Sequence, residues 1–375
     1  MANAIYKIYY LFVAVLSLYS IFSKIKPSTQ KYWFIVISLP LVCFAMCRPF
    51  GLMRDDPFYE VITSWQIEDY ISKIQSLRDP LFYVVALALS KFFNSTKSIL
   101  VFVGFVLMLK LIVIYRLGGN NKLLLLFMYV SIYWQLHDLT QLRVSLSAFL
   151  FLAYFYFYKA SLRFYAVIFG VFSMLAHAQA LLNILIIYNK RLFSKQSAFL
   201  IVFFSLFMIG VGWVPSLEMI FNFYDFLSKY LDFQLSEAFR SYVIIYQSDW
   251  APKNKRLPLI LVVNLFIYSY VMLSLDKNVL AKPHVKKAYS SILMAAVLSW
   301  IFASTSDIQV RLYEYYFVAG LVIAAEVVKR QSLILLYTLS VCYFVKFNVL
   351  FDIWNLGVID KLIDTEISNF LKRLQ

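Results

Sequence analysis

Long apolar runs, separated by short polar connectors, follow one another along almost the whole chain. As helices, many of them are long enough to cross a hydrocarbon layer about 30 Å thick. The pattern predicts about twelve membrane-spanning helices. They are expected at 5–22, 32–46, 81–93, 99–115, 123–134, 144–158, 164–188, 198–214, 257–275, 289–302, 312–328 and 333–350.

The composition agrees with this pattern. Of the 375 residues, 62% are hydrophobic and only 15% are charged. A soluble domain of this length could not bury so much apolar surface. We therefore predict an all-α polytopic integral membrane protein with about 11–13 transmembrane helices. Residues 1–375 are expected to form a single integral membrane domain, whose first apolar run reads as a signal anchor.

The net charge of +15 does not indicate nucleic-acid binding, because the basic residues are spread over short connectors. Such connectors are typical of the cytoplasmic side of a membrane, where they contact anionic lipid headgroups. Four basic connectors are predicted to be cytoplasmic, namely 23–31, 189–196, 276–287 and 329–332. Two longer loops, at about 48–79 and 213–256, are predicted to face outward.

Two further basic connectors, at 116–122 and 159–163, would fall outside if every run crossed the membrane once. A break within the 164–188 run, or a short re-entrant pair there, would place all the basic connectors on the cytoplasmic side. Irregular backbone at membrane depth is tolerated where it lines a watery cavity or is buried in protein. The misfit therefore lies near the place where a functional site is expected.

The outward loop at 213–256 carries an amphipathic pattern between residues 217 and 231. Leu217, Ile220 and Phe221 share one face, while Glu218 and Asp225 fall away from it. This pattern predicts a helix that lies on the outer membrane surface and covers a cavity. An amphipathic connector that only packs on the bundle is the alternative.

Four groups of polar residues interrupt the apolar pattern. They are Arg48, Arg54, Asp55, Asp56 and Tyr59; Arg78, Asp79 and Tyr83; His137, Asp138, Gln141 and Arg143 with His177 and Gln179; and Asp307, Arg311, Tyr313 and Glu314. Arginines at the ends of runs can bind a phosphate or diphosphate with their planar fork of donors. Carboxylates and a histidine nearby can orient or deprotonate a hydroxyl. Together these groups favour an enzyme that acts on a lipid-linked, phosphate-bearing substrate.

Simpler interpretations compete for single residues. Arginines at helix ends also anchor among headgroups, and a lone histidine is more often a hydrogen-bonded core residue than a catalyst. Lys110 is interpreted as a lysine that snorkels to the membrane surface. Glu326 is expected to form an interfacial ion pair with the nearby Lys329 and Arg330.

Five segments occur in an order and spacing that resembles the EpsG/Wzy group of bacterial polysaccharide polymerases. They read "CRPFGLMRDDPFY", "DPLFY", "QLRVSLSAFLFLAYFYFYKASLRFY", "LAHAQALLNIL" and "VRLYEYYFVAG", and the resemblance covers most of residues 32–330. Two departures stand out. Gln141 precedes Arg143, where that family more often has the glutamine after the arginine. The outer loop also carries a second acidic residue beside Asp56.

The resemblance implies an O-antigen polymerase type of glycosyltransferase, with a GT-C-like bundle and an outer-face cavity. Such an enzyme joins oligosaccharide units carried on undecaprenyl diphosphate at the outer face of the bacterial inner (cytoplasmic) membrane. The product would be a surface polysaccharide such as the O-antigen of lipopolysaccharide, a capsule or an exopolysaccharide. The implied enzyme needs no metal or other cofactor. The implied partners are the lipid-linked oligosaccharides, membrane lipid, a chain-length regulator and a flippase.

The resemblance also implies roles for individual residues. Catalytic roles fall to Arg143, His177, Arg311 and Asp56. Substrate-binding roles fall to Arg48, Arg54, Tyr59, Asp79, Tyr83, Gln141, Gln179 and Tyr315.

Three other functions stay open at this point. A GT-C glycosyltransferase that uses a polyprenyl-phosphate sugar would place an acidic pair in an early outer loop, as Asp55 and Asp56 could. An O-antigen ligase has a similar cavity but normally a larger outer loop. A transporter or flippase is less favoured, because the hydropathy shows no pseudo-symmetric halves.

Overall fold

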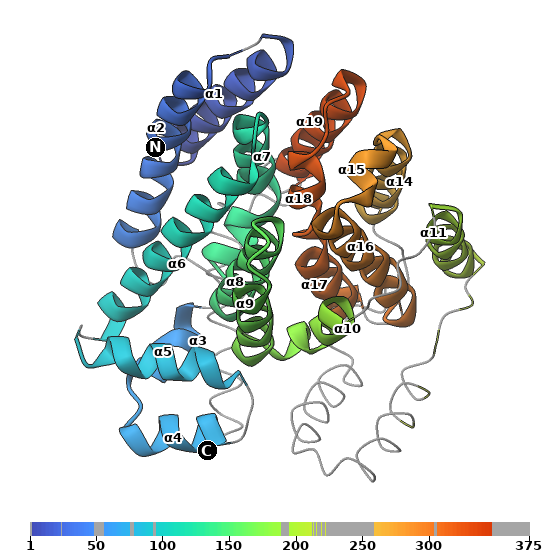
Figure 1. Cartoon of the computed structure of the whole chain (residues 1–375). Coiled ribbons are helices and arrows are strands. Elements are labelled where there is room, and N and C mark those ends of the chain that lie inside the picture. The colour runs from blue at the N-terminus through green and yellow to red at the C-terminus, as the bar shows by residue number, and fades with distance from the viewer. Residues whose placement is uncertain are drawn as a thin grey trace.

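The computed structural model describes residues 2–23, 25–48, 56–75, 79–92, 95–188, 195–211, 259–303 and 306–346, together with Trp213, Pro215, Met219 and Asn222. Every regular element in this part of the chain is a helix, and the described residues contain no strand (Figure 1). The predicted all-α class is therefore confirmed for the described residues. Arg54 and Asp55 lie outside them, and so does the helix expected over 217–231, apart from Met219 and Asn222.

The elements carry the labels of Figure 1. In chain order they are α1 (Ala2–Phe22), α2 (Pro27–Cys47), α3 (Asp56–Thr63), α4 (Ile67–Gln75), α5 (Pro80–Ser90), α6 (Ser95–Leu117), α7 (Lys122–Tyr129), the π-helix η1 (Val130–Asp138), α8 (Leu142–Lys159), α9 (Arg163–Ala176), the 3₁₀ helix η2 (Ala178–Leu182), α10 (Asn183–Tyr188), α11 (Lys195–Gly210), α14 (Leu259–Ser274), α15 (Lys277–Ala281), α16 (Pro283–Ile301), α17 (Ser306–Phe317), α18 (Gly320–Ala325) and α19 (Arg330–Val345).

The apolar runs form helices, but several of these helices are shorter than expected. Among the described residues, only α2 and residues 97–117 of α6 are long and apolar enough to cross a membrane by length and composition. Eight further apolar helices in this part of the chain are 10–17 residues long. Two long apolar helices are by themselves weak evidence for a membrane protein, since a buried core helix has the same properties.

Three of the predicted runs are divided. The run at 123–134 changes from α-helix to π-helix at Val130, and the run at 312–328 is split between α17 and α18. The run at 164–188 breaks at His177, whose backbone is extended, with φ −159° and ψ 133°. The loop at 48–79 holds two short helices, α3 and α4, which the hydropathy pattern did not reveal because they are only one-sidedly apolar.

After the break at His177 the chain turns back along α9. Ile187 of α10 packs on Gly170 of α9, where a Cβ would lie only 2.5 Å from the Ile187 Cδ1 atom. Closer to the break, the Asn183 amide of α10 donates to the Ser173 hydroxyl of α9 at 2.8 Å. Residues 163–188 are thus a helical hairpin rather than one straight helix. The break predicted from the charge pattern is present.

The basic connectors among the described residues gather at one end of the bundle, whereas most of the predicted connector at 189–196 lies outside those residues. The Lys159 ammonium donates to the Leu117 carbonyl at 3.1 Å, and the Asn121 amide donates to the Val327 carbonyl at 2.7 Å. The Arg330 guanidinium lies 3.9 Å from the centre of the Phe22 ring. The connectors at 116–122 and 159–163 would lie outside if every run crossed the membrane once. In the structure they lie at the same end of the bundle as the connector before α19.

Glu326 is the carboxylate at the centre of this basic end. It does not pair as expected with its sequence neighbours. Its partners are Lys159 at 2.7 Å, Lys282 at 2.6 Å and His284 at 3.2 Å. The hydrogen bond from His284 lowers the pKa of Glu326, burial opposes this, and the two lysines lower it further, so that the pKa lies below its ordinary value. One carboxylate thus ties together the ends of α8, α15 and α18.

The hairpin can be tested by a double-mutant cycle. Ile187→Val alone removes a packed methyl group and is expected to cost about 0.5–1.5 kcal/mol of unfolding free energy. In a Gly170→Ala background the same change relieves the contact with the new Cβ, so this cost should vanish or reverse. We expect a coupling of about 1 kcal/mol in chemical unfolding of the purified protein. Additive effects would show that α10 does not pack on α9.

Candidate functional site

The corner between η1 and α8 is the point where several distant segments meet. The backbone N–H of Leu142 donates to the Tyr59 hydroxyl at 2.9 Å, and the Arg48 guanidinium donates to the Leu139 carbonyl at 3.3 Å. A π-helix such as η1 is uncommon and often marks a functional region. The corner lies at the opposite end of α8 from Lys159, about 25 Å away at the rise of an α-helix.

Asp79 joins three elements at this corner. One carboxylate oxygen accepts a hydrogen bond from Arg143 Nη1 at 2.8 Å. The other accepts from the backbone N–H of Ala178 at 2.7 Å and lies 3.2 Å from Nδ1 of His177. Asp79 therefore connects the start of α5 with α8 and with the break in the α9–α10 hairpin.

The backbone of Asp79 is in the left-handed region, with φ 55°. This conformation is uncommon for a residue other than glycine, although aspartate tolerates it better than most residues. Pro80 follows directly and opens α5. Local strain of this kind persists where surrounding contacts hold it, and it is concentrated at functional sites.

The three side chains differ in their exposure. That of Asp79 is 1% exposed, whereas those of His177 and Arg143 are 13% and 20% exposed. The Arg143 guanidinium also lies 5.1 Å from the centre of the Phe58 ring, which stabilises its charge by a cation–π contact. A buried carboxylate thus holds one histidine and one arginine at the surface of the corner.

Burial raises the pKa of Asp79, but the charge and hydrogen bond of His177 lower it, and Arg143 and the Ala178 N–H lower it further. The net pKa lies well below its ordinary value. Asp79 therefore stays ionised at neutral pH. Its contribution to stability is present above the ordinary pKa of an aspartate and is lost as the pH falls through the lowered value.

Arg48 and Asp56 face each other instead of solvent. Two guanidinium nitrogens of Arg48 contact the two carboxylate oxygens of Asp56 at 2.5 and 2.7 Å. The two side chains are 0% and 1% exposed. The resemblance implied substrate binding for Arg48 and catalysis for Asp56, but the structure places both in a closed pair. Since Arg48 also bonds Leu139, we assign the pair to holding α2 and α3 against the corner.

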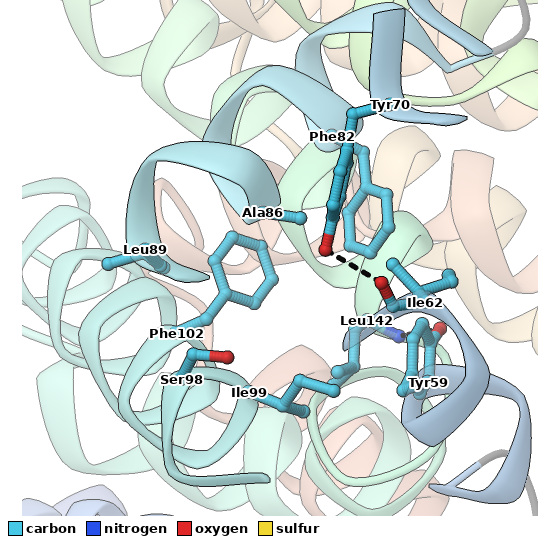
Figure 2. A pocket seen from close by; sticks show the side chains of 10 residues that line it. All are labelled: Tyr59, Ile62, Tyr70, Phe82, Ala86, Leu89, Ser98, Ile99, Phe102 and Leu142. Atoms are coloured by element: carbon cyan, nitrogen blue, oxygen red, sulfur yellow. Dashed lines mark hydrogen bonds between the residues drawn. The ribbon is translucent and has the colours of Figure 1, made fainter. Parts of the chain in front are cut away.

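Tyr59 and Tyr83 are buried and also serve the packing around the corner. Tyr83 stacks on Trp65 with ring centres 5.7 Å apart. Tyr59 lines a small apolar cavity of about 20 Å³ together with Leu142 and Ile99 (Figure 2). A cavity of this size holds about one water molecule and cannot hold a sugar.

The two glutamines lie next to the cluster. Gln141 directly precedes α8, and its backbone carbonyl accepts from the N–H of Ser145 at 2.8 Å. Gln179 lies in η2, two residues after His177, and its backbone carbonyl accepts from the Tyr316 hydroxyl at 2.9 Å. Both are half-buried, so they remain candidates for contact with a bound molecule.

The two residues expected on α17 lie in different surroundings. Tyr315 is fully buried, and its hydroxyl lies 2.8 Å from the Asn183 amide and 3.0 Å from the Ser147 hydroxyl. This network holds the α9–α10 hairpin to α8 and to α17, and the substrate-binding role implied for Tyr315 stays a prediction. Arg311 is half-buried one helical turn earlier on α17.

The interpretation of Lys110 as a lysine that snorkels to the membrane surface is wrong. It does not reach a surface but forms a buried ion pair with Asp138 of η1, with side chains that are 1% and 0% exposed. The Ser145 hydroxyl bonds both residues, and the Tyr129 hydroxyl donates to the second oxygen of Asp138. The sequence does contain a sign of this pair, because Lys110 and Asp138 have opposite charges and both lie in or beside apolar runs. Charged side chains buried in such surroundings usually pair with each other.

A scan against protein-family models and searches of curated proteins and of solved structures found no match to this chain.

The assignment of Arg48 and Asp56 can be tested by stability measurements. Asp56→Leu leaves a buried guanidinium without its counter-charge and is expected to cost about 3–5 kcal/mol of unfolding free energy. The double variant Arg48→Met/Asp56→Leu removes both charges and should recover most of that loss. Chemical unfolding of the purified variants measures both. A double variant that is no more stable than Asp56→Leu would contradict the paired role.

Proposed function

We propose that the protein is a membrane-embedded glycosyltransferase of the polysaccharide polymerase type. It would join lipid-diphosphate-linked oligosaccharide units at the outer face of the bacterial inner membrane. The observation that carries the proposal is the meeting of Asp79, Arg143 and His177. They come from three separate motifs of the resemblance and lie 64 and 98 residues apart along the chain, measured from Asp79.

The surface of the bundle supports a membrane location. On α1 and α2, large apolar side chains point outward, with Ile8 69% and Leu39 61% exposed. Apolar faces of this extent are covered by lipid or protein in folded proteins. The basic connectors that the structure describes collect at the end of the bundle away from Arg143. By the positive-inside rule that end would be cytoplasmic, and the corner would face outward.

The cluster has the groups that glycosyl transfer from a diphosphate requires. Arg143 is partly exposed and can offer its planar fork to a phosphate oxygen. Asp79 holds Nδ1 of His177, so the other ring nitrogen, Nε2, can accept a proton. The acceptor sugar hydroxyl would attack the anomeric carbon of the donor and give its proton to His177. The bond from that carbon to the diphosphate would break, and the diphosphate would leave with the electron pair, stabilised by Arg143.

The glycosyltransferase that uses a polyprenyl-phosphate sugar is less favoured. That function would need an open acidic pair at Asp55 and Asp56. Asp56 is 1% exposed, and both of its carboxylate oxygens contact Arg48.

Deleting the gene in its host tests the proposed function. Without a polymerase, the surface glycan should remain as single repeat units on its lipid anchor, and the long chains should disappear. Electrophoresis of the extracted glycan measures the chain-length distribution, and re-expression of this chain should restore it. A normal distribution of long chains in the deletion strain would contradict the proposal.

The role of Arg143 is tested separately. Arg143→Lys keeps the charge but loses the planar fork, so polymerisation of purified lipid-linked units should fall by at least about tenfold at normal protein levels. Arg163→Lys is the matched control, because Arg163 is exposed at the basic end of the bundle, and it should have no effect. Full activity of Arg143→Lys would mean that this arginine only anchors the helix.

A further inference from the structure

The buried ion pair of Lys110 and Asp138 reaches the same helical turn that carries Arg143. The Ser145 hydroxyl of α8 lies 2.9 Å from the Lys110 ammonium and 2.5 Å from a carboxylate oxygen of Asp138. Tyr129 bonds the remaining oxygen of that carboxylate. These four residues, here called the Lys110 network, join α6, α7, η1 and α8.

The first turn of α8 is therefore held from two sides. Arg143 and Ser145 are two positions apart, which places them about 200° apart around the helix axis. Asp79 holds the turn on the side of Arg143, at 2.8 Å. The Lys110 network holds it on the side of Ser145. A shift of α8 toward either side would lengthen one of these contacts.

A buried ion pair of this kind is not explained by stability alone. Replacing such a pair with apolar residues is often neutral or even stabilising, and the best-attested use of buried polar groups is to specify register. The π-helix η1 is a place where register needs to be specified, because a π-helix has poorer intrinsic stability than an α-helix. Asp138 is its last residue, and α8 begins four residues later.

We propose that the Lys110 network is a positioning device, which fixes the register of η1 against α8 and thereby sets the place of the Arg143 guanidinium relative to Asp79. Lys110, Asp138 and Ser145 act through Arg143 and do not touch a substrate. The catalytic consequence rests on the function proposed above. The position of Arg143 can be measured whether or not the proposed function is right.

The test compares the reactivity of Arg143 toward phenylglyoxal in the purified full-length protein, read by peptide mass spectrometry. Ser145→Ala removes the hydroxyl and leaves the charges balanced. Arg143 should then be modified at least about threefold faster, because the hydroxyl makes two hydrogen bonds that hold the turn and the loss of even one has about that effect. Ser145→Thr keeps a hydroxyl and should restore the wild-type rate. Exposed Arg163 provides the internal reference.

Ser340→Ala is the matched control, since Ser340 is also buried but among the described residues its hydroxyl bonds only a carbonyl of its own helix, at 2.9 Å. It should leave the Arg143 rate unchanged. Tyr129→Phe removes a hydroxyl from the other side of Asp138 and should raise the rate as Ser145→Ala does. An Arg143 rate that is unchanged in both Ser145→Ala and Tyr129→Phe would overturn the positioning role, whatever their activity.

Activity then separates this inference from the proposed function. If both hold, Ser145→Ala lowers kcat by about tenfold with a smaller change in KM, and Ser145→Thr recovers it. If the Arg143 rate rises while polymerisation is unchanged, the positioning role stands and the proposed role of Arg143 fails. A loss of activity that Ser145→Thr does not recover, with an unchanged Arg143 rate, contradicts the positioning role.

Discussion

Three buried carboxylates around the η1–α8 corner are each paired with a basic side chain. Asp56 pairs with Arg48, Asp138 with Lys110, and Asp79 with Arg143. In an apolar surrounding an unpaired charge costs several kcal/mol of folding free energy. The fold therefore depends on the formation of these pairs. Because the partners come from different helices, pairing the charges also determines which helices meet.

The three pairs differ in what they leave accessible. The pairs of Asp56 and Asp138 are closed to solvent on all sides. The pair of Asp79 is open on one side, where Arg143 and His177 reach the surface. A partly exposed arginine beside a histidine oriented by a carboxylate is able to bind an anion and to accept a proton. We therefore propose that the open pair is the functional site and that the closed pairs support it.

Much of the fold could be anticipated from the sequence. The apolar runs predicted helices, and the runs proved helical in the described residues. The charge of the connectors predicted a break within residues 164–188, and His177 is where α9 ends. Hydropathy reports only average apolarity, however. It could not show that the runs are cut into shorter helices, nor that α3 and α4 interrupt the loop before Asp79.

The sequence alone determined which elements are present, namely the helices and the basic connectors. It also showed that a few charged residues lie near apolar runs, where they need a partner or a function. Which of those charges face each other was decided only by the tertiary structure. Arg48 and Arg143 look alike in sequence, as arginines at the ends of runs. Arg48 is closed off by Asp56, whereas Arg143 stays open beside His177. The physical reason is that pairing depends on distances between side chains from helices far apart in the chain, and hydropathy and local spacing carry no information about those distances.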